Sequence, residues 1–104
     1  MRRLAPLLVI AAVLASVLAV SAFAATTTTS WKVPTNKTVK IRKGGTVKWV
    51  WGDGQPHNVK GPGFKSKVLT GKGKSYSHRF GSKGTFKIIC QIHPTSMKTT
   101  VKVS

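Results

Sequence analysis

One short stretch of the chain brings together three side chains that bind soft or borderline metals. Cys90 is the only cysteine, His93 follows it three residues later, and Met97 follows after four more. A thiolate, an imidazole and a thioether can each donate an electron pair to a transition metal. His57 lies upstream and could add a second imidazole. A metal site and a reactive thiol are therefore the first two hypotheses.

The ligand types favour copper over zinc and over nucleophilic catalysis. Two imidazoles and a thiolate in one plane, with a weak axial thioether, form the blue-copper arrangement of electron-transfer proteins. Structural zinc prefers four strong ligands, which Cys90 and His93 with a thioether do not supply. A Cys–His hydrolase needs an oxyanion site and usually an orienting Asn or Asp. The only acid is Asp53, and so short a chain leaves little room for a substrate cleft.

The cysteine count limits the role of the thiol. A disulfide within the chain needs two cysteines, so Cys90 is a link to another chain, an inert buried thiol or a ligand. Outside the cell an accessible thiolate is readily oxidised. We therefore expect the Cys90 thiol to be occupied by a bound partner.

The beginning of the chain reads as a secretory signal. Two arginines at positions 2 and 3 precede an apolar run over residues 4–20, and Ala22 and Ala24 form an A-x-A cleavage pattern. The alternative is an uncleaved anchor, although a run of 17 residues is at the short limit for a membrane span. We expect cleavage before residue 25.

The sequence then divides into a signal at 1–24, a short polar lead at 25–30 and a domain at 31–104. Cleavage leaves 104 − 24 = 80 residues, which make one small domain with a marginal core. We expect a monomer in the periplasm or outside the cell, with no membrane span after signal cleavage.

The charge is extreme. The chain has 18 Lys and Arg residues against one acid, for a net charge of +17, and loss of the two signal arginines leaves 17 − 2 = +15. Such a charge attracts anionic partners and says nothing about the fold. The lysines are spread along the chain rather than gathered with exposed aromatic residues, so we expect no specific nucleic-acid binding.

Short runs of alternating apolar and polar residues, divided by Gly, Pro, Asn and Ser, extend through the domain. This pattern predicts an all-β fold, an antiparallel Greek-key β-sandwich. The positions expected to face inward are Val39, Ile41, Val47, Trp49, Trp51, Tyr76, His78, Phe80, Phe86, Ile88, Cys90, Val101 and Val103. Because loops from different strands meet at one end of a sandwich, His57, Cys90, His93 and Met97 could converge there.

The order of these motifs resembles the small cupredoxins, of the plastocyanin, amicyanin and pseudoazurin kind, over nearly all of the mature chain. The matching segments are TVKWV, PHNV, SYSHRF, GTFKIIC and QIHPTSMKTTVKV. The resemblance implies one type 1 copper ion, with His57, Cys90 and His93 as equatorial ligands and Met97 as the axial ligand. It also implies that Asn58 ties the two ligand loops together by hydrogen bonds.

The chain departs from the family pattern at three points. Three residues separate His93 from Met97, a gap between the shorter amicyanin loop and the longer plastocyanin loop. Thr99 stands where the family usually has Gly, and Trp51 stands where it usually has Asn. We expect these changes to affect packing and the docking surface more than the metal.

The resemblance implies an exported carrier of single electrons rather than an enzyme. His93 would be the electron port, with Ile92 and Pro94 in an apolar docking patch. The basic charge predicts an acidic redox partner, such as a cytochrome or a dehydrogenase or oxidase domain. Two alternatives stay open: a copper-handling protein for resistance or delivery on the same fold, and a basic secreted anion-binding module.

Overall fold

The computed structural model describes residues 25–104, and the signal predicted at 1–24 lies outside the described residues. Ten β-strands make up the regular structure of this part of the chain. No helix suited to crossing a membrane is found among residues 25–104. The prediction of an all-β fold is confirmed.

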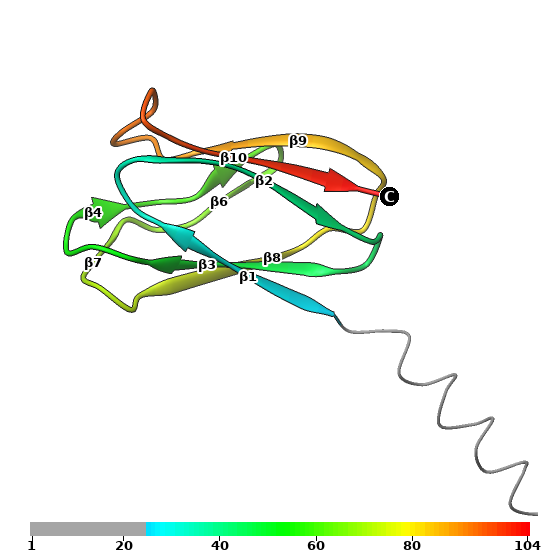
Figure 1. Cartoon of the computed structure of the whole chain (residues 1–104), viewed down its shortest axis with the longest axis horizontal. Helices are drawn as coiled ribbons and strands as arrows, with labels where there is room; N and C mark the ends of the chain where they lie inside the picture. Colours follow the sequence, from blue (N-terminus) through cyan, green and yellow to red (C-terminus); the bar gives the residue numbers. More distant parts are fainter. Residues whose placement is uncertain (1–24) are drawn as a thin grey trace, which may run out of the picture.

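The strands are β1 (Thr26–Trp31), β2 (Thr35–Ile41), β3 (Thr46–Trp51), β4 (Pro56–His57), β5 (Lys60–Gly61), β6 (Phe64–Lys65), β7 (Leu69–Thr70), β8 (Ser75–Arg79), β9 (Gly84–Ile89) and β10 (Met97–Val103). They form a three-stranded sheet in the order β1-β3-β8, a five-stranded sheet in the order β2-β10-β9-β5-β6, and the small pair β4-β7. Figure 1 shows the two larger sheets facing each other, with β9 and β10 on the upper side and β3 and β8 on the lower side.

The strand directions correct one part of the prediction. The sandwich is present, but its sheets are mixed, because β1 pairs with β3 and β10 pairs with β2 in parallel. The pairs β3-β8 and β9-β10 are antiparallel, as expected. Period-2 alternation shows which side of a strand is buried, and that pattern is the same for either direction of the neighbour.

The polar lead is also different from the expectation. The segment Thr26–Trp31 is strand β1, paired residue by residue with β3 from Thr26–Thr46 to Trp31–Trp51. Its threonines are β-branched and suit a half-buried strand, although their polarity suggests a loose segment. The sandwich therefore begins at β1 rather than at residue 31.

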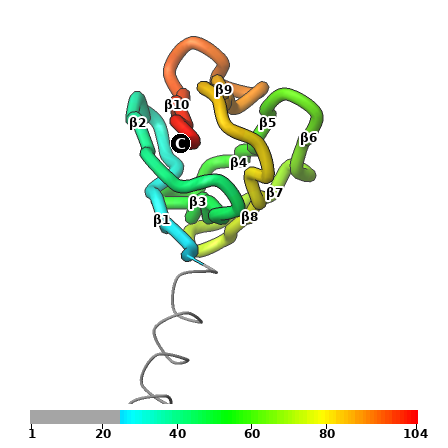
Figure 2. The backbone as a smooth tube through the Cα atoms, turned by 90° about the vertical axis from the view of Figure 1, so that its right-hand side faces the viewer, coloured from blue at the N-terminus to red at the C-terminus, as the bar shows by residue number. Residues whose placement is uncertain are grey.

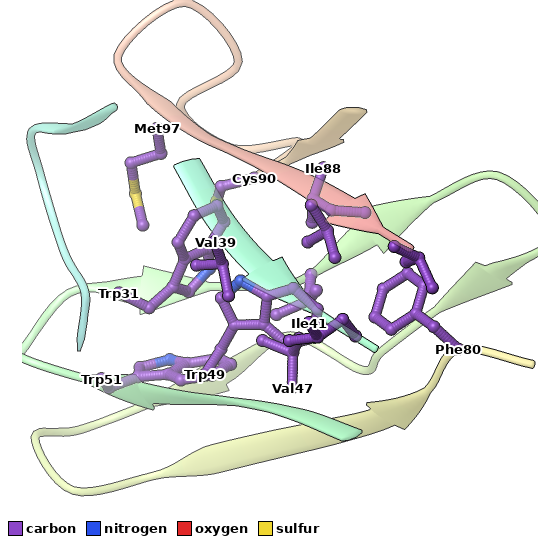
Figure 3. Packing of buried hydrophobic residues seen from close by; sticks show 13 residues of the cluster. Trp31, Val39, Ile41, Val47, Trp49, Trp51, Phe80, Ile88, Cys90 and Met97 are labelled. Carbon is purple, nitrogen blue, oxygen red and sulfur yellow. The ribbon is translucent and has the colours of Figure 1, made fainter. Parts of the chain in front are cut away.

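The core lies between the two larger sheets and is rich in tryptophan. Trp31 and Trp49 are fully buried and Trp51 is 1% exposed. Every indole N–H has an acceptor: the Asn58 carbonyl for Trp31 at 3.0 Å, the Thr99 hydroxyl for Trp49 at 3.3 Å and the Leu69 carbonyl for Trp51 at 2.8 Å. These bonds remove the cost of burying a polar N–H and fix each ring in one orientation. Figure 3 shows Cys90 and Met97 at one end of this core and Phe80 at the other.

The two ends of the sandwich carry different segments. The loops at 52–55, 71–74 and 90–96 lie at the left-hand end in Figure 1, which we call the site end. The opposite end, which we call the base, holds residue 25, the turns at 42–45 and 80–83, and the C-terminus. Figure 2 looks onto the base, where the C-terminus and the turn between β2 and β3 face the viewer.

Candidate metal centre

The loop between β9 and β10 is closed by its own backbone. Cys90 directly follows β9, and its N–H donates to the Met97 carbonyl at 3.2 Å. The Met97 N–H in turn donates to the His93 carbonyl at 3.0 Å. The Thr35 N–H, from the start of β2, donates to the Ser96 carbonyl at 2.9 Å. The loop is therefore tied to itself and to the sheet, which holds its three candidate ligands in place.

His57 reaches this loop from the β4-β7 pair. Its side chain is fully buried, and its Nδ1 lies 3.9 Å from Cys90 Sγ. The centroids of the His57 and His93 rings are 5.3 Å apart and the rings meet edge to face. Met97 is fully buried at the same end of the core, as Figure 3 shows. The structure thus brings together at the site end all four residues that the sequence predicts as ligands.

One ring nitrogen of His93 lacks a hydrogen-bond partner within the described chain. This atom, Nε2, is buried. A buried polar nitrogen without a partner costs about 1–3 kcal/mol unless a ligand or ordered water satisfies it. The His93 ring lies beside the ring of His57, another candidate ligand.

The donor atoms are close to one another but do not form a closed coordination sphere. Within the described residues, no three His, Cys, Asp or Glu side chains form a ready metal-binding group. The side-chain contacts join His57 to Cys90 and His57 to His93, and the fourth donor is a thioether. A soft thiolate, a soft thioether and two imidazoles suit copper in both Cu(I) and Cu(II) forms. The arrangement is therefore consistent with a type 1 copper site.

Asp53 is a functional residue that the sequence reasoning overlooked. Its Oδ1 lies 2.6 Å from His57 Nε2 and accepts from the Gln55 N–H at 3.1 Å, and its Oδ2 accepts from the Val33 N–H at 3.0 Å. Burial by itself raises the pKa of the Asp53 carboxyl, but the hydrogen bonds from Val33, His57 and Gln55 outweigh it and hold the pKa below its ordinary 3.8. One signal could have revealed it: it is the only acid of the chain and lies four residues before His57.

The Asp53 contact determines which nitrogen of His57 is available. An ionised carboxylate only accepts hydrogen bonds, so a neutral His57 must carry its proton on Nε2. The lone pair is then on Nδ1, the nitrogen that faces Cys90 Sγ. Carboxylates that hold the far nitrogen of a ligand histidine in this way fix both its tautomer and its ring orientation.

Asn58 lies between the two ligand segments. Its Nδ2 donates to Gln91 Oε1 at 2.8 Å, and its Oδ1 accepts from the Gln91 N–H at 2.8 Å. Its carbonyl accepts from the Trp31 indole, which adds β1 to the network. Gln91, adjacent to Cys90, was not identified from the sequence, and no spacing rule would have paired it with Asn58.

The residues around His93 form the rim of the site end. Ile92 is 40% exposed, one of two large apolar residues so exposed among residues 25–104, and Pro94 is also exposed. His93 itself is half-buried, whereas His57 and Cys90 are fully enclosed. His93 is therefore the candidate ligand with a path to the surface.

Comparison with known proteins agrees with this description. No protein-family model matches the chain. The chain is 36% identical over 62 residues to Amicyanin-alpha of Methylorubrum extorquens, a match over 54% of the chain and 52% of that protein. The chain thus spans about half the length of this curated relative.

Solved structures match over more of the chain. A purple cupredoxin from Nitrosopumilus maritimus superposes with a TM-score of 0.61 at 25% identity, over 72% of this chain and 98% of that one. An oxidized amicyanin with a methionine-to-leucine change superposes with a TM-score of 0.61 at 26% identity, over 72% of this chain and 80% of that one.

The fold is a cupredoxin-like sandwich of mixed sheets. In both sequence and structure the chain is amicyanin-like, which confirms the resemblance read from its motifs.

Proposed function

We propose that this chain is a type 1 copper protein that carries single electrons, with the ion held by His57, Cys90, His93 and Met97. The observation that carries the proposal is the convergence of His57 Nδ1 on Cys90 Sγ at 3.9 Å, inside a water-excluding core. Another amicyanin structure is described as a Cu(I) form, which supports copper as the metal.

Copper, when bound, would supply the Cu(II)/Cu(I) couple and with it the capacity to accept and release one electron. The protein's own residues supply the setting. Cys90 and Met97 are fully buried, so their sulfur atoms are shielded from water and oxidants. Asp53 and Asn58 hold His57 and the Cys90 segment through bonds that need no metal. A prearranged site of this kind needs little rearrangement when its charge changes.

The rim suggests how a partner would dock. Exposed Ile92 and Pro94 beside His93 offer an apolar contact, and exposed Lys98 lies at the start of β10 next to them. The positive field of the chain favours an acidic redox protein, such as a cytochrome or a dehydrogenase or oxidase domain. Removal of the signal and export to the periplasm or cell exterior stay predictions from the sequence.

The test of the metal assignment is a visible absorption spectrum during titration with Cu(II). We expect one equivalent of copper to produce an intense blue, green or purple colour from thiolate-to-copper charge transfer. Cys90→Ser and His57→Ala should lose this band, whereas His78→Ala, which removes a histidine outside the site, should keep it. A colourless wild-type complex would refute the type 1 assignment.

The test of the carrier role is stopped-flow oxidation of the reduced protein by candidate acceptors across a series of salt concentrations. Steering by charge raises association rates by about 10- to 1000-fold at low salt, so the rate should fall steeply as salt rises. Lys98→Glu should slow the reaction, and Lys102→Glu, further along the same strand toward the base, is the matched control. Rapid loss of copper with slow electron exchange would favour copper delivery instead.

A further inference from the structure

A cavity of the described chain lies at the base, away from the candidate metal centre. It has a volume of about 980 Å³ and opens between the turns at 42–45 and 80–83. Four of the residues that line it are cations, namely Lys40, Arg42, Lys43 and Arg79. All four are exposed, and we call this set the basal cations.

The basal cations have no acidic partner among residues 25–104. The only acidic side chain, Asp53, is at the site end and is hydrogen-bonded to His57. The Arg79 guanidinium lies beside both turns of the base. A Cβ atom added at Gly44 would lie 3.4 Å from Arg79 Nη2, and one added at Gly81 would lie 3.5 Å from Arg79 Nη1. The two turns thus leave room for the guanidinium, which lines the cavity together with Ser104 and has no ion pair among residues 25–104.

The size of the cavity argues against a single small anion. A water molecule occupies about 30 Å³ in the liquid, so the cavity would hold roughly thirty of them. One phosphate ion would contact at most a fraction of so open a hollow. A surface that presents many phosphate groups could engage all four basal cations together.

The position of Ala25, the first described residue, indicates that this surface is a membrane. Ala25 lines the same cavity, and the apolar run of the sequence ends at residue 20, five positions earlier. Five residues span at most about 18 Å when fully extended. Whenever that apolar run lies in a membrane, the basal cations are therefore within reach of the lipid headgroups. The cations remain on the domain if the run is removed.

We propose that the base binds the phosphate headgroups of an anionic membrane surface. In this orientation the site end, with His93 and its apolar rim, faces away from the membrane and stays open to a redox partner. The proposal adds a second surface to the protein and is independent of the metal assignment.

The experiment uses the protein purified as it is exported from cells that express the full sequence, and vesicles of phosphatidylglycerol with phosphatidylcholine. Arg42→Gln, Lys43→Gln and Arg79→Gln are combined in one variant. Lys32→Gln, Lys72→Gln and Lys74→Gln, all exposed and at the site end, are combined in a control with the same net charge. Both are measured by co-sedimentation at several salt concentrations.

A cation near an anionic membrane contributes about fivefold to binding, so we expect the basal variant to bind about 100-fold more weakly than the wild type. The control variant should lose less than about tenfold, because its three lysines are at the site end and lie away from the membrane surface. Equal losses in the two variants would overturn the proposal, because binding would then reflect diffuse charge. Binding to pure phosphatidylcholine vesicles would overturn it as well.

Two further measurements test whether the base binds free phosphate instead and whether the variants are folded. Inorganic phosphate at matched ionic strength should displace the protein from vesicles no better than chloride does, and stronger displacement would indicate a site for free phosphate instead. The circular dichroism spectrum of both copper-free variants should equal that of the wild type, which shows that they are folded. Failure of membrane binding with a normal copper spectrum would leave the proposed electron-carrier function intact.

Discussion

Replacing Asp53 with alanine would test whether one carboxylate organises the site end. Asp53 accepts hydrogen bonds from His57 and from the N–H groups of Val33 and Gln55, and so joins its own loop to β4 and to the segment between β1 and β2. His57 is fully buried, so Asp53→Ala removes the hydrogen-bond partner of a buried imidazole nitrogen. Gln55 is exposed, and water can replace its lost bond.

The cost follows from these differences in burial. An unsatisfied buried donor on His57 costs about 1–3 kcal/mol, and the part-buried Val33 bond contributes about 0.5–1.5 kcal/mol more. The sum is about 1.5–4.5 kcal/mol for Asp53→Ala. An 80-residue domain has a free energy of unfolding of roughly 4–12 kcal/mol, so the loss is a large fraction of it. At about 4–8 °C for each kcal/mol, the melting temperature should fall by at least ~6 °C.

The assay is thermal unfolding of the copper-free protein by circular dichroism, with nitrogen NMR of His57 as a second readout. Asp53→Asn keeps one acceptor oxygen and should lose less stability than Asp53→Ala. Gln55→Ala, in the same exposed loop, is the control and should unfold within about 2 °C of the wild type. The NMR signal of His57 should show a proton on Nε2 in the wild type and a mixture of tautomers in Asp53→Ala. If Asp53→Ala matched the wild type in both readouts, the positioning role would be wrong.

Three more outcomes follow from particular contacts. Met97→Leu should raise the reduction potential of the copper protein and Met97→Gln should lower it, because the axial ligand tunes the couple; equal potentials by voltammetry would exclude Met97 as axial ligand. Burial lowers the pKa of His78 from its ordinary 6.5, so the unfolded state binds more protons, and the free energy of unfolding should fall as pH drops below 6.5 toward the folded-state pKa. His78→Phe, which keeps the stacking on Phe64, should be less sensitive to pH over this window in urea titrations. Gly61→Ala would place a Cβ 2.5 Å from Phe64 Cε2 and should lower the free energy of unfolding, measured by urea titration, by about 1–3 kcal/mol. Gly54→Ala, whose Cβ meets nothing within 4 Å, is the control and should lower it by less than about 1 kcal/mol.

The local pattern of the sequence was sufficient for much of the fold. Alternation placed Val47, Trp49 and Trp51 on one face of a strand, and all three are buried in the core. It also placed Cys90 at the inward-facing end of a strand, where the structure has it fully buried. These predictions succeed because burial on a pleated strand depends on positions two apart, which are near neighbours in the sequence.

The alternation of apolar and polar residues could not predict which strands pair or in which direction. β1 was expected to be a loose lead, because its threonines are polar, and it is ordered by its backbone bonds to β3. The parallel partners of β1 and β10 were not foreseen either, since alternation is identical in both directions. Which strand lies beside which is decided by how two hydrophobic faces close over one core.

For the candidate site, the residue types and spacing of the chain by themselves determined which chemistry is possible: a lone thiol, two imidazoles and a thioether in an order typical of cupredoxins. Only the tertiary structure decided how these groups are oriented. Asp53 selects the His57 nitrogen that faces Cys90, and Asn58 binds Gln91 across the two ligand segments. The basal cations likewise come from β2, the turn that follows it and β8. The physical reason is that a hydrogen bond or a charge cluster depends on distances of a few ångströms in space, which separation along the chain does not encode.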